Sequence, residues 1–209
     1  MTVDLDEHDV TLRDGTRAVI RPITPDDRWR LQEGLRLLSP RSRYLRFHAP
    51  IDHLTADQLT YLTHVDYRDH MAWVALNPDA PDEPGMGVAR YVRLVDEPAV
   101  AEAAVTVLDR YQGRGLGTVL LKRLAATAAA NGITTLRNYV LAENTAMLEV
   151  FDALGARRVD EGAGVYRIDV PVEGAEQQRS TAREILREIA RGVLPPLREL
   201  FAGRGDVDV

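Results

Sequence analysis

The spacing of apolar side chains changes along the chain and separates helical from extended segments. Between about residues 24 and 70, leucines recur at three- and four-residue intervals, as at Leu31, Leu35 and Leu38, which predicts amphipathic helices. From Met71 onward, β-branched and small apolar residues alternate or run together, which predicts strands. The expected order is one strand, two or three helices, three strands, a helix, a strand, a helix and two strands. This order indicates an α/β or α+β fold with a mixed sheet.

Cap and turn residues set the expected boundaries. Thr24-Pro25, Ser39-Pro40 and Thr55 are helix starts, because Ser and Thr cap the first turn and Pro fits its first position. The expected strands are residues 16–23, 71–76, 85–95, 99–108 and 133–141, with two more within 156–170. The expected helices are residues 24–38, 39–45, a third from 55, a fourth from the glycine-rich loop to about 130, and 144–154, ended by Gly155.

The residues from Glu173 onward have a different pattern. Apolar residues there recur at helical spacing, at Ala182, Ile185, Leu186, Ile189 and Val193. We therefore expect one domain over residues 1–171 and an amphipathic helical tail over residues 172–209. The tail is expected to dock on the domain or on a partner subunit, which would make a homo-oligomer. The alternative is a regulatory or target-binding helix.

Composition narrows the class of protein. The net charge of −6 argues against a nucleic-acid partner, which normally requires a basic face. The chain has no cysteine, which excludes disulfides, thiolate nucleophiles and cysteine-based zinc sites. No signal peptide and no apolar run of about 18 residues is visible, so we expect a cytoplasmic protein with no membrane partner.

A glycine-rich loop links the strand ending near Leu108 to a helix. The backbone N–H groups of a helix N-terminus bind anions, and glycine lets the main chain approach phosphate oxygens closely. A nucleoside triphosphate loop needs Gly-Lys-Ser/Thr, whereas Gly117 is followed by Thr118. A dinucleotide loop needs G-x-G-x-x-G, whereas Gly113, Gly115 and Gly117 make G-x-G-x-G in mid-chain. Acyl-coenzyme A is the third interpretation.

Two sequence blocks support that third interpretation. The residues Gln112-x-x-Gly115-x-Gly117 match the acceptor loop Q/R-x-x-G-x-G/A of the GNAT superfamily of N-acetyltransferases, which this chain resembles over residues 17–170. The block from Asn144 to Phe151 with Gly155-Ala156 is similar to a later Asn…Tyr…Gly-Phe block of that superfamily. The stretches that resemble its bacterial protein lysine acetyltransferase, or Pat, branch are Leu12–Gly15, Ile20–Ile23, Ser39–Phe47 and Val65–Tyr67.

The resemblance implies a fold and a co-substrate. The fold is a GNAT-type mixed, largely antiparallel sheet with helices on both faces and with strands four and five splayed apart. The co-substrate is acetyl-CoA, with no metal; its pantetheine pairs with strand four and its pyrophosphate lies on the loop amides. Asn144 is expected to cap its helix and also to reach the cofactor, or only to cap it. The implied cofactor-binding residues are Val105, Val107, Gln112, Gly113, Arg114, Gly115, Leu116, Gly117, Thr118 and Asn144.

Glu102 is the candidate catalytic base. A lysine ammonium, with a pKa of about 10.4, must lose a proton before it attacks. Glu102 is the single charged residue in the apolar segment Val100–Val105 and precedes Gln112 by ten residues, where many superfamily members place a catalytic glutamate. Burial would make its carboxylate a stronger base. We expect it to take the proton directly or through water; the alternative is a solvent-facing glutamate on an edge strand.

The sequence departs from the superfamily at Phe151, where a tyrosine often acts as an acid towards the coenzyme A thiolate. The acid is therefore another group or absent. Tyr139 and Tyr166 are weak substitutes, and we expect both to pack in the core or the cleft.

Four histidines fall within one short window but lack a tight metal-ligand spacing. We expect them to line the acceptor side of the cleft or to lie on the surface. They are His48, His53, His64 and His70.

These observations predict an N-acetyltransferase that moves the acetyl group of acetyl-CoA to an amine, which we expect to be a protein lysine. Transfer would be by direct attack in a ternary complex, since no cysteine can carry an acyl group. The alternatives are a small-molecule amine acetyltransferase of the same fold and a non-catalytic acyl-CoA-sensing domain.

Overall fold

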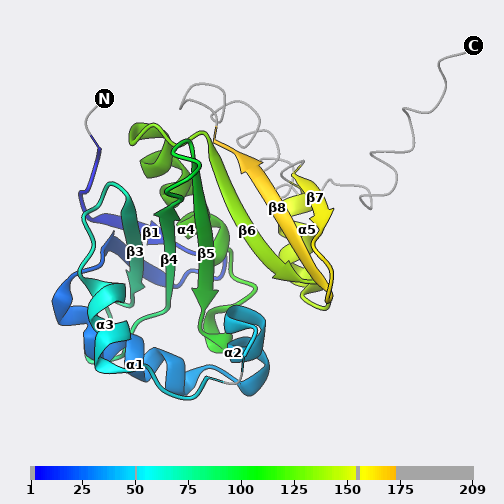
Figure 1. The fold of residues 1–209 in the computed structure, drawn as a ribbon. Coiled ribbons are helices and arrows are strands. Elements are labelled where there is room, and N and C mark those ends of the chain that lie inside the picture. Colours follow the sequence, from blue (N-terminus) through cyan, green and yellow to red (C-terminus); the bar gives the residue numbers. More distant parts are fainter. Residues whose placement is uncertain (1–2, 50, 154–155, 173–209) are drawn as a thin grey trace, which may run out of the picture. The chain divides into compact units, whose positions relative to one another are not determined.

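A mixed eight-stranded sheet forms the centre of the computed structural model, which describes residues 3–49, 51–153 and 156–172 (Figure 1). The strand order is β1-β2-β3-β4-β5-β6-β8-β7. The strands are β1 (His8–Thr11), β2 (Arg17–Pro22), β3 (His70–Leu76), β4 (Gly87–Arg93), β5 (Val100–Val107), β6 (Thr135–Leu141), β7 (Arg157–Asp160) and β8 (Val165–Pro171). The helices are η1 (Pro25–Asp27), α1 (Arg28–Leu37), α2 (Pro40–Phe47), α3 (Ala56–Thr63), η2 (Asp109–Tyr111), α4 (Leu116–Ala130) and α5 (Thr145–Ala153).

The predicted helix starts are confirmed by cap contacts. Ser39 Oγ accepts a hydrogen bond from the backbone N–H of Ser42 at 3.1 Å at the start of α2. Thr55 and Gln58 form a reciprocal capping box at the start of α3, with distances of 3.2 and 2.8 Å. The predicted tail from residue 173, and the predicted helix end at Gly155, lie outside the described residues.

The hydrophobic pattern of the sequence does not predict β1. This strand pairs antiparallel with β2 from His8↔Ile20 to Thr11↔Arg17. It has four residues with a half-polar pattern, so its period is too short to recognise without its partner.

Helices cover both faces of the sheet, as predicted. α4 packs on β3, β4 and β5, where Trp73 and Tyr91 are fully buried and the Trp73 indole N–H donates to Thr127 Oγ1 at 3.0 Å. On the opposite face, Leu31 of α1 packs against the cluster that contains Val74. All strand pairs are antiparallel except β5–β6, which the α4 crossover makes parallel.

The splay of strands four and five is confirmed, and these strands are β5 and β6 here. β5 pairs with β4 along its length, from Gly87↔Val107 to Arg93↔Ala101. Its pairing with β6 covers only Val100↔Thr135 to Glu102↔Arg137. The two strands then diverge towards their carboxyl ends (Figure 1), while β6 continues to pair with β8. The result is a V-shaped opening within the sheet.

Arg137 holds the narrow end of this V together. Its guanidinium donates to Asp169 of β8 at 2.9 Å and to Glu97 of the β4–β5 turn at 2.5 Å. Hydrogen bonds from Arg137 to these two carboxylates raise the pKa of Arg137 above its ordinary value, so its guanidinium stays charged.

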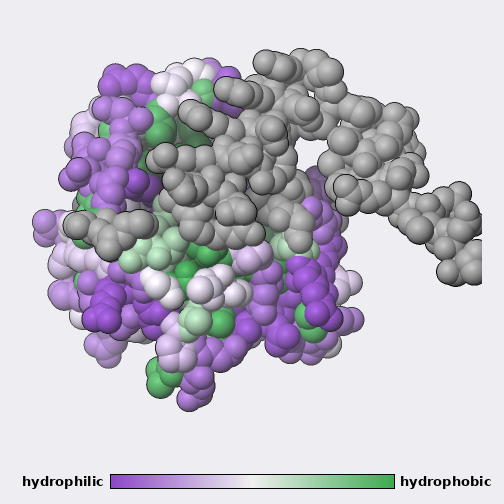
Figure 2. Space-filling model, turned by 90° about the horizontal axis from the view of Figure 1, so that it is seen from above, coloured by the Kyte–Doolittle hydropathy of each residue, from purple (hydrophilic) through white to green (hydrophobic). Residues whose placement is uncertain are grey.

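The surface is largely polar. Charged residues make up 28% of the chain, and polar side chains dominate the rim in the view from above, with apolar residues nearer its middle (Figure 2). Within the described part of the chain, no helix is both long and apolar enough to cross a bilayer.

Asp27 is a buried carboxylate that joins β2 to α1. Its side chain is 1% exposed and receives both terminal nitrogens of Arg21, at 2.8 and 2.7 Å, and the backbone N–H of Thr24 at 2.8 Å. Burial alone would raise the pKa of Asp27, but the hydrogen bonds from Arg21 and Thr24 outweigh burial and hold this pKa below its ordinary value. The ionised carboxylate therefore stabilises the fold.

We predict that Asp27→Asn lowers the free energy of unfolding by about 3 kcal/mol at pH 7, because it leaves guanidinium groups without their buried partner. An acid with a lowered folded-state pKa stabilises the fold above its unfolded-state pKa of about 3.9 and loses that effect as the pH falls through the folded-state value. The deficit of the variant should thus shrink below about pH 3.9. Urea unfolding at neutral and acidic pH measures both effects.

The matched control is Asp26→Asn, at the exposed neighbouring position. It should change the unfolding free energy by less than about 0.5 kcal/mol. Equal effects of the two substitutions would contradict the assignment.

Candidate active site

The side of β5 that faces the opening presents backbone hydrogen-bonding groups. The N–H of Leu108 donates to Met86 O at 3.0 Å, and Val100 O accepts from Leu94 N–H at 2.9 Å, so the even-numbered residues bond towards β4. Because successive residues of a strand point their backbone groups to opposite edges, those of Val105 and Val107 face the V. An extended ligand with amide groups can pair with this edge as an added strand would.

The glycine loop lies where β5 ends and α4 begins. Gly113 and Gly115 have φ angles of 72° and 88°, in the left-handed region that glycine adopts without a Cβ clash. Gly115 is the N-cap of α4, and its carbonyl accepts the first helical hydrogen bond, from Val119 N–H at 3.1 Å. The N–H groups of Leu116, Gly117 and Thr118 belong to the first turn, where they have no partner within the helix. They are suited to bind an anion.

Gln112 and Arg114 contact the protein. Gln112 Nε2 donates to Val107 O at 3.0 Å, which ties the loop to β5. Arg114 pairs with Asp14 at 2.7 Å, and its carbonyl accepts from Arg13 N–H at 3.3 Å. The β1–β2 turn therefore contacts the glycine loop and supports it.

A second support for the loop was not predicted. The carboxylate of Asp109 accepts hydrogen bonds from the backbone N–H of Ser39 at 3.0 Å, from Ser39 Oγ at 2.9 Å and from Ser42 Oγ at 2.7 Å. Burial opposes ionisation of Asp109, but these hydrogen bonds outweigh it and lower the pKa of Asp109. The start of α2 is thereby held against the end of β5. The Ser-x-x-Ser spacing is visible in the sequence, but its acceptor lies some 70 residues away.

The expectation that Glu102 is buried is wrong. The side chain is exposed, because alternation along β5 turns Ala101 and Ala103 towards α4 and turns Glu102 to the opposite face. There it lies beside Arg137 of β6 and near Arg46 of α2. Burial lowers the pKa of Arg46, and the negative charge of Glu102 counteracts part of this effect. A carboxylate at the narrow end of the V is available to a ligand or to water.

Asn144 caps α5. Its Oδ1 accepts from the backbone N–H of Met147 at 3.3 Å, and its carbonyl accepts from the same group at 3.1 Å. The side chain is half-buried, and its contact with the cofactor stays a prediction.

Phe151 is 3% exposed and packs with Val140, Leu148 and Ile168 in a second apolar cluster. Tyr166 packs against the same cluster, as expected. Tyr139 is not in the core, because its side chain is 41% exposed, and its place in the cleft stays a prediction. The register places Tyr139 on the same face as Glu102, two residues beyond Arg137.

The four histidines do not converge. His48 and His64 are exposed at the ends of α2 and α3, and His53 is exposed beside Asp52. His70 is half-buried, and its Nε2 lies 3.0 Å from Arg90 Nη1. Among the described residues, no group of three His, Cys, Asp or Glu side chains is arranged to hold a metal ion.

Comparison with known proteins identifies the family. The model of the acetyltransferase (GNAT) family matches residues 35–156. Acetyltransferase Pat of Mycolicibacterium smegmatis is 35% identical over 87% of this chain and 57% of its own length, so the chain spans little more than half of that relative. An acetyltransferase of Pseudomonas aeruginosa is 36% identical over 69% of this chain and 77% of its own length.

A solved structure agrees with the sequence comparison. The crystal structure of the GNAT domain of S. lividans PAT superposes with a TM-score of 0.72 at 36% identity, covering 79% of this chain and 96% of that domain. The family match includes β3 to β6, α4 and α5, which carry the V and the glycine loop. The chain therefore belongs to the acetyltransferase (GNAT) family.

Proposed function

We propose that this chain is an acetyl-CoA-dependent N-acetyltransferase that acetylates lysine side chains of proteins. The observation that carries the proposal is the V between β5 and β6, which opens beside the glycine-capped N-terminus of α4. The free edge of β5 in the V suits an extended amide chain, and the adjoining N-terminus of α4 suits a pyrophosphate. Coenzyme A has both groups in this order, and its thioester supplies the acetyl group.

The residues around the V have distinct roles in this proposal. The backbone groups of Val105 and the N–H of Val107 face the pantetheine arm, since Val107 O already accepts from Gln112. The amides of residues 113–118 hold the pyrophosphate. The N–H of Val107 also points into the V, where it stabilises negative charge on the thioester oxygen. Gln112 and Arg114 keep the loop in place through the contacts described above. Asn144 orients α5 at the other arm of the V.

Glu102 takes the proton from the attacking ammonium, directly or through water. Its exposure on the face opposite α4 leaves it accessible to an acceptor entering beside α2. The amine nitrogen then bonds to the acetyl carbon as the carbon–sulfur bond breaks, and the second proton that the nitrogen loses passes to the thiolate, directly or through water. The thiolate leaves without a tyrosine at position 151, because a thiol pKa near 8.5 makes the thiolate a tolerable leaving group.

The choice of a protein lysine is supported by the similarity to acetyltransferase Pat, which covers 87% of this chain and so extends well beyond the acetyl-CoA loop. The Pat-like stretches Leu12–Gly15 and Ser39–Phe47 support the same choice. Incubation of the protein with labelled acetyl-CoA and a cell lysate, followed by mass spectrometry, tests this choice. Label on protein lysines supports it, whereas label only on small amines favours the small-molecule alternative. The absence of coenzyme A release with any acceptor would favour a non-catalytic acyl-CoA sensor.

We predict that Gly115→Val weakens acetyl-CoA binding at least about tenfold, a change of about 1.4 kcal/mol. A side chain is strained at this φ of +88°, and an added Cβ would lie 3.3 Å from Nε of Arg13, so the first-turn amides must move. Isothermal titration calorimetry measures the dissociation constant.

The matched control for this prediction is Gly132→Val at the other end of α4. It has a similar φ of +76° but no atom within 4 Å of the added Cβ. Both variants lose some stability, and only Gly115→Val should lose affinity. Unchanged binding in Gly115→Val would refute the assignment of the loop.

We predict that Glu102→Gln lowers kcat by about a hundredfold and leaves acetyl-CoA affinity unchanged, because only proton removal is lost. The deficit should decrease from pH 6 to pH 9, as more of the acceptor amine is neutral without help. Steady-state rates over that range provide the measurement, with Glu149→Gln on the exposed face of α5 as the control. A rate that Glu102→Gln leaves unaltered at every pH would rule out the base.

A further inference from the structure

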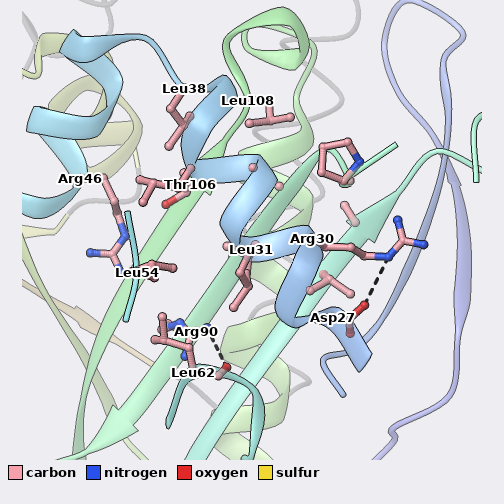
Figure 3. A pocket seen from close by; sticks show the side chains of 18 of the residues that line it. Asp27, Arg30, Leu31, Leu38, Arg46, Leu54, Leu62, Arg90, Thr106 and Leu108 are labelled. Atoms are coloured by element: carbon pink, nitrogen blue, oxygen red, sulfur yellow. Dashed lines mark hydrogen bonds and ion pairs between the residues drawn. The ribbon is translucent and has the colours of Figure 1, made fainter. Parts of the chain in front are cut away.

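A cavity of about 100 Å³ lies between the helices α1 and α2 and the sheet face that carries Glu102 (Figure 3). Most of its wall is apolar. The apolar residues that Figure 3 labels there are Leu31, Leu38, Leu54, Leu62 and Leu108. Thr106 of β5 also lines the cavity, on the same face as Glu102. The cavity therefore adjoins the candidate active site.

Three arginines line this apolar space (Figure 3). Arg30 of α1 faces Asp27, whereas Arg46 comes from α2 and Arg90 from β4. Arg90 is 8% exposed. Its Nη2 donates to Leu62 O at 3.1 Å, and its Nη1 lies 3.0 Å from His70 Nε2. Burial and the charge of Arg90 lower the pKa of His70 to about 4, so this histidine is neutral at pH 7. Both partners of Arg90 are thus uncharged.

Two carboxylates lie near the cavity, and neither forms an ion pair with Arg46 or Arg90. Asp27, at the other end, binds Arg21 and lies 3.5 Å from Arg30. Glu102 is the carboxylate whose charge acts on Arg46. Within the described part of the chain, no carboxylate forms an ion pair with Arg46 or Arg90.

A buried guanidinium without a counter-ion is costly. Burial lowers the pKa of Arg90 to about 10, and the charge of Arg46 contributes to the shift. Of the five N–H groups of a guanidinium, two are accounted for by the contacts of Arg90 to His70 and Leu62. A ligand carboxylate would supply the missing charge and accept bidentate hydrogen bonds from this planar group.

We propose that Arg46 and Arg90 bind a carboxylate of the acceptor, so that the enzyme prefers an amine that carries a carboxylate close by. The inference rests on the proposed function and names the acceptor class of the same site. Arg90 faces Ala104 in the register. Ala104 lies two residues along β5 from Glu102, so the Cα atoms of Ala104 and Glu102 are about 7 Å apart. A lysine beside a Glu or Asp in a peptide presents an amine and a carboxylate over such a span.

Paired acceptors test this inference. Alanine-rich peptides with one lysine are compared with Glu or Gln at the residue before or after it. For the wild type, kcat/KM should be at least about tenfold higher with Glu than with Gln at one of these positions, about 1.4 kcal/mol of discrimination. Free L-lysine and cadaverine, which differ by a carboxylate, form the small-molecule pair. Preference for lysine over cadaverine without preference among peptides identifies a free amino acid as the source of the carboxylate.

The arginine variants connect this preference to the cavity. Arg90→Met and Arg46→Met should reduce the Glu/Gln ratio to about one. Arg46→Lys should retain part of the ratio, because a charge remains. Arg46 is half-buried, so its variants should fold and should show the change in the Glu/Gln ratio even if Arg90→Met does not fold. Arg36→Met, on the exposed side of α1, is the control and should keep the wild-type ratio.

Two results would overturn the inference. The first is equal kcat/KM for the Glu and Gln peptides together with equal values for lysine and cadaverine, which leaves the proposed function intact. The second is a wild-type ratio in both Arg46→Met and Arg90→Met, which would place the carboxylate elsewhere. Failure to acetylate any of these acceptors would refute the proposed function itself and this inference with it.

Discussion

The separation of β5 from β6 is the constraint on which the candidate site depends. β6 leaves β5 after Arg137 but continues to pair with β8 through its other edge, from Thr135 to Leu141. The second apolar cluster, which contains Phe151 and Ile168, packs β6 and β8 against α5. Arg137 closes the other end with two carboxylates. The backbone groups of β5 are thus left available by the architecture and not by a local irregularity.

The glycine loop has its shape because other elements hold it. Gly115, with a left-handed backbone conformation at the start of α4, positions the first-turn amides. Two segments far away in the sequence, the β1–β2 turn and the start of α2, hold the loop in place. Arg114 reaches the β1–β2 turn through Asp14, and Asp109 reaches the start of α2 through Ser39. These contacts bring segments near the N-terminus against the glycine loop. They support the candidate site without being part of it.

A buried charge has partners of opposite charge at one end of the cavity and only neutral partners at the other end. Asp27 is buried with Arg21 and Arg30, so its charge is compensated and contributes to stability. Arg90 is buried with a neutral histidine and a backbone carbonyl, and its nearest charged neighbour on α2 is another arginine. The molecule is acidic overall, with a net charge of −6, yet this cavity is cationic. Local arrangement, and not net charge, decides what an acceptor meets there.

The order of the elements, the helix caps at Ser39 and Thr55, and the glycine-rich start of α4 can be predicted from the sequence, because each depends on residues adjacent in the chain. The environment of single side chains depends on the fold. Alternation along β5 left Glu102 exposed, although its sequence neighbours are apolar. Likewise, packing buried Phe151, and pairing across strands brought Arg90 next to α2 and α3. Such environments arise from long-range contacts, which no local pattern records.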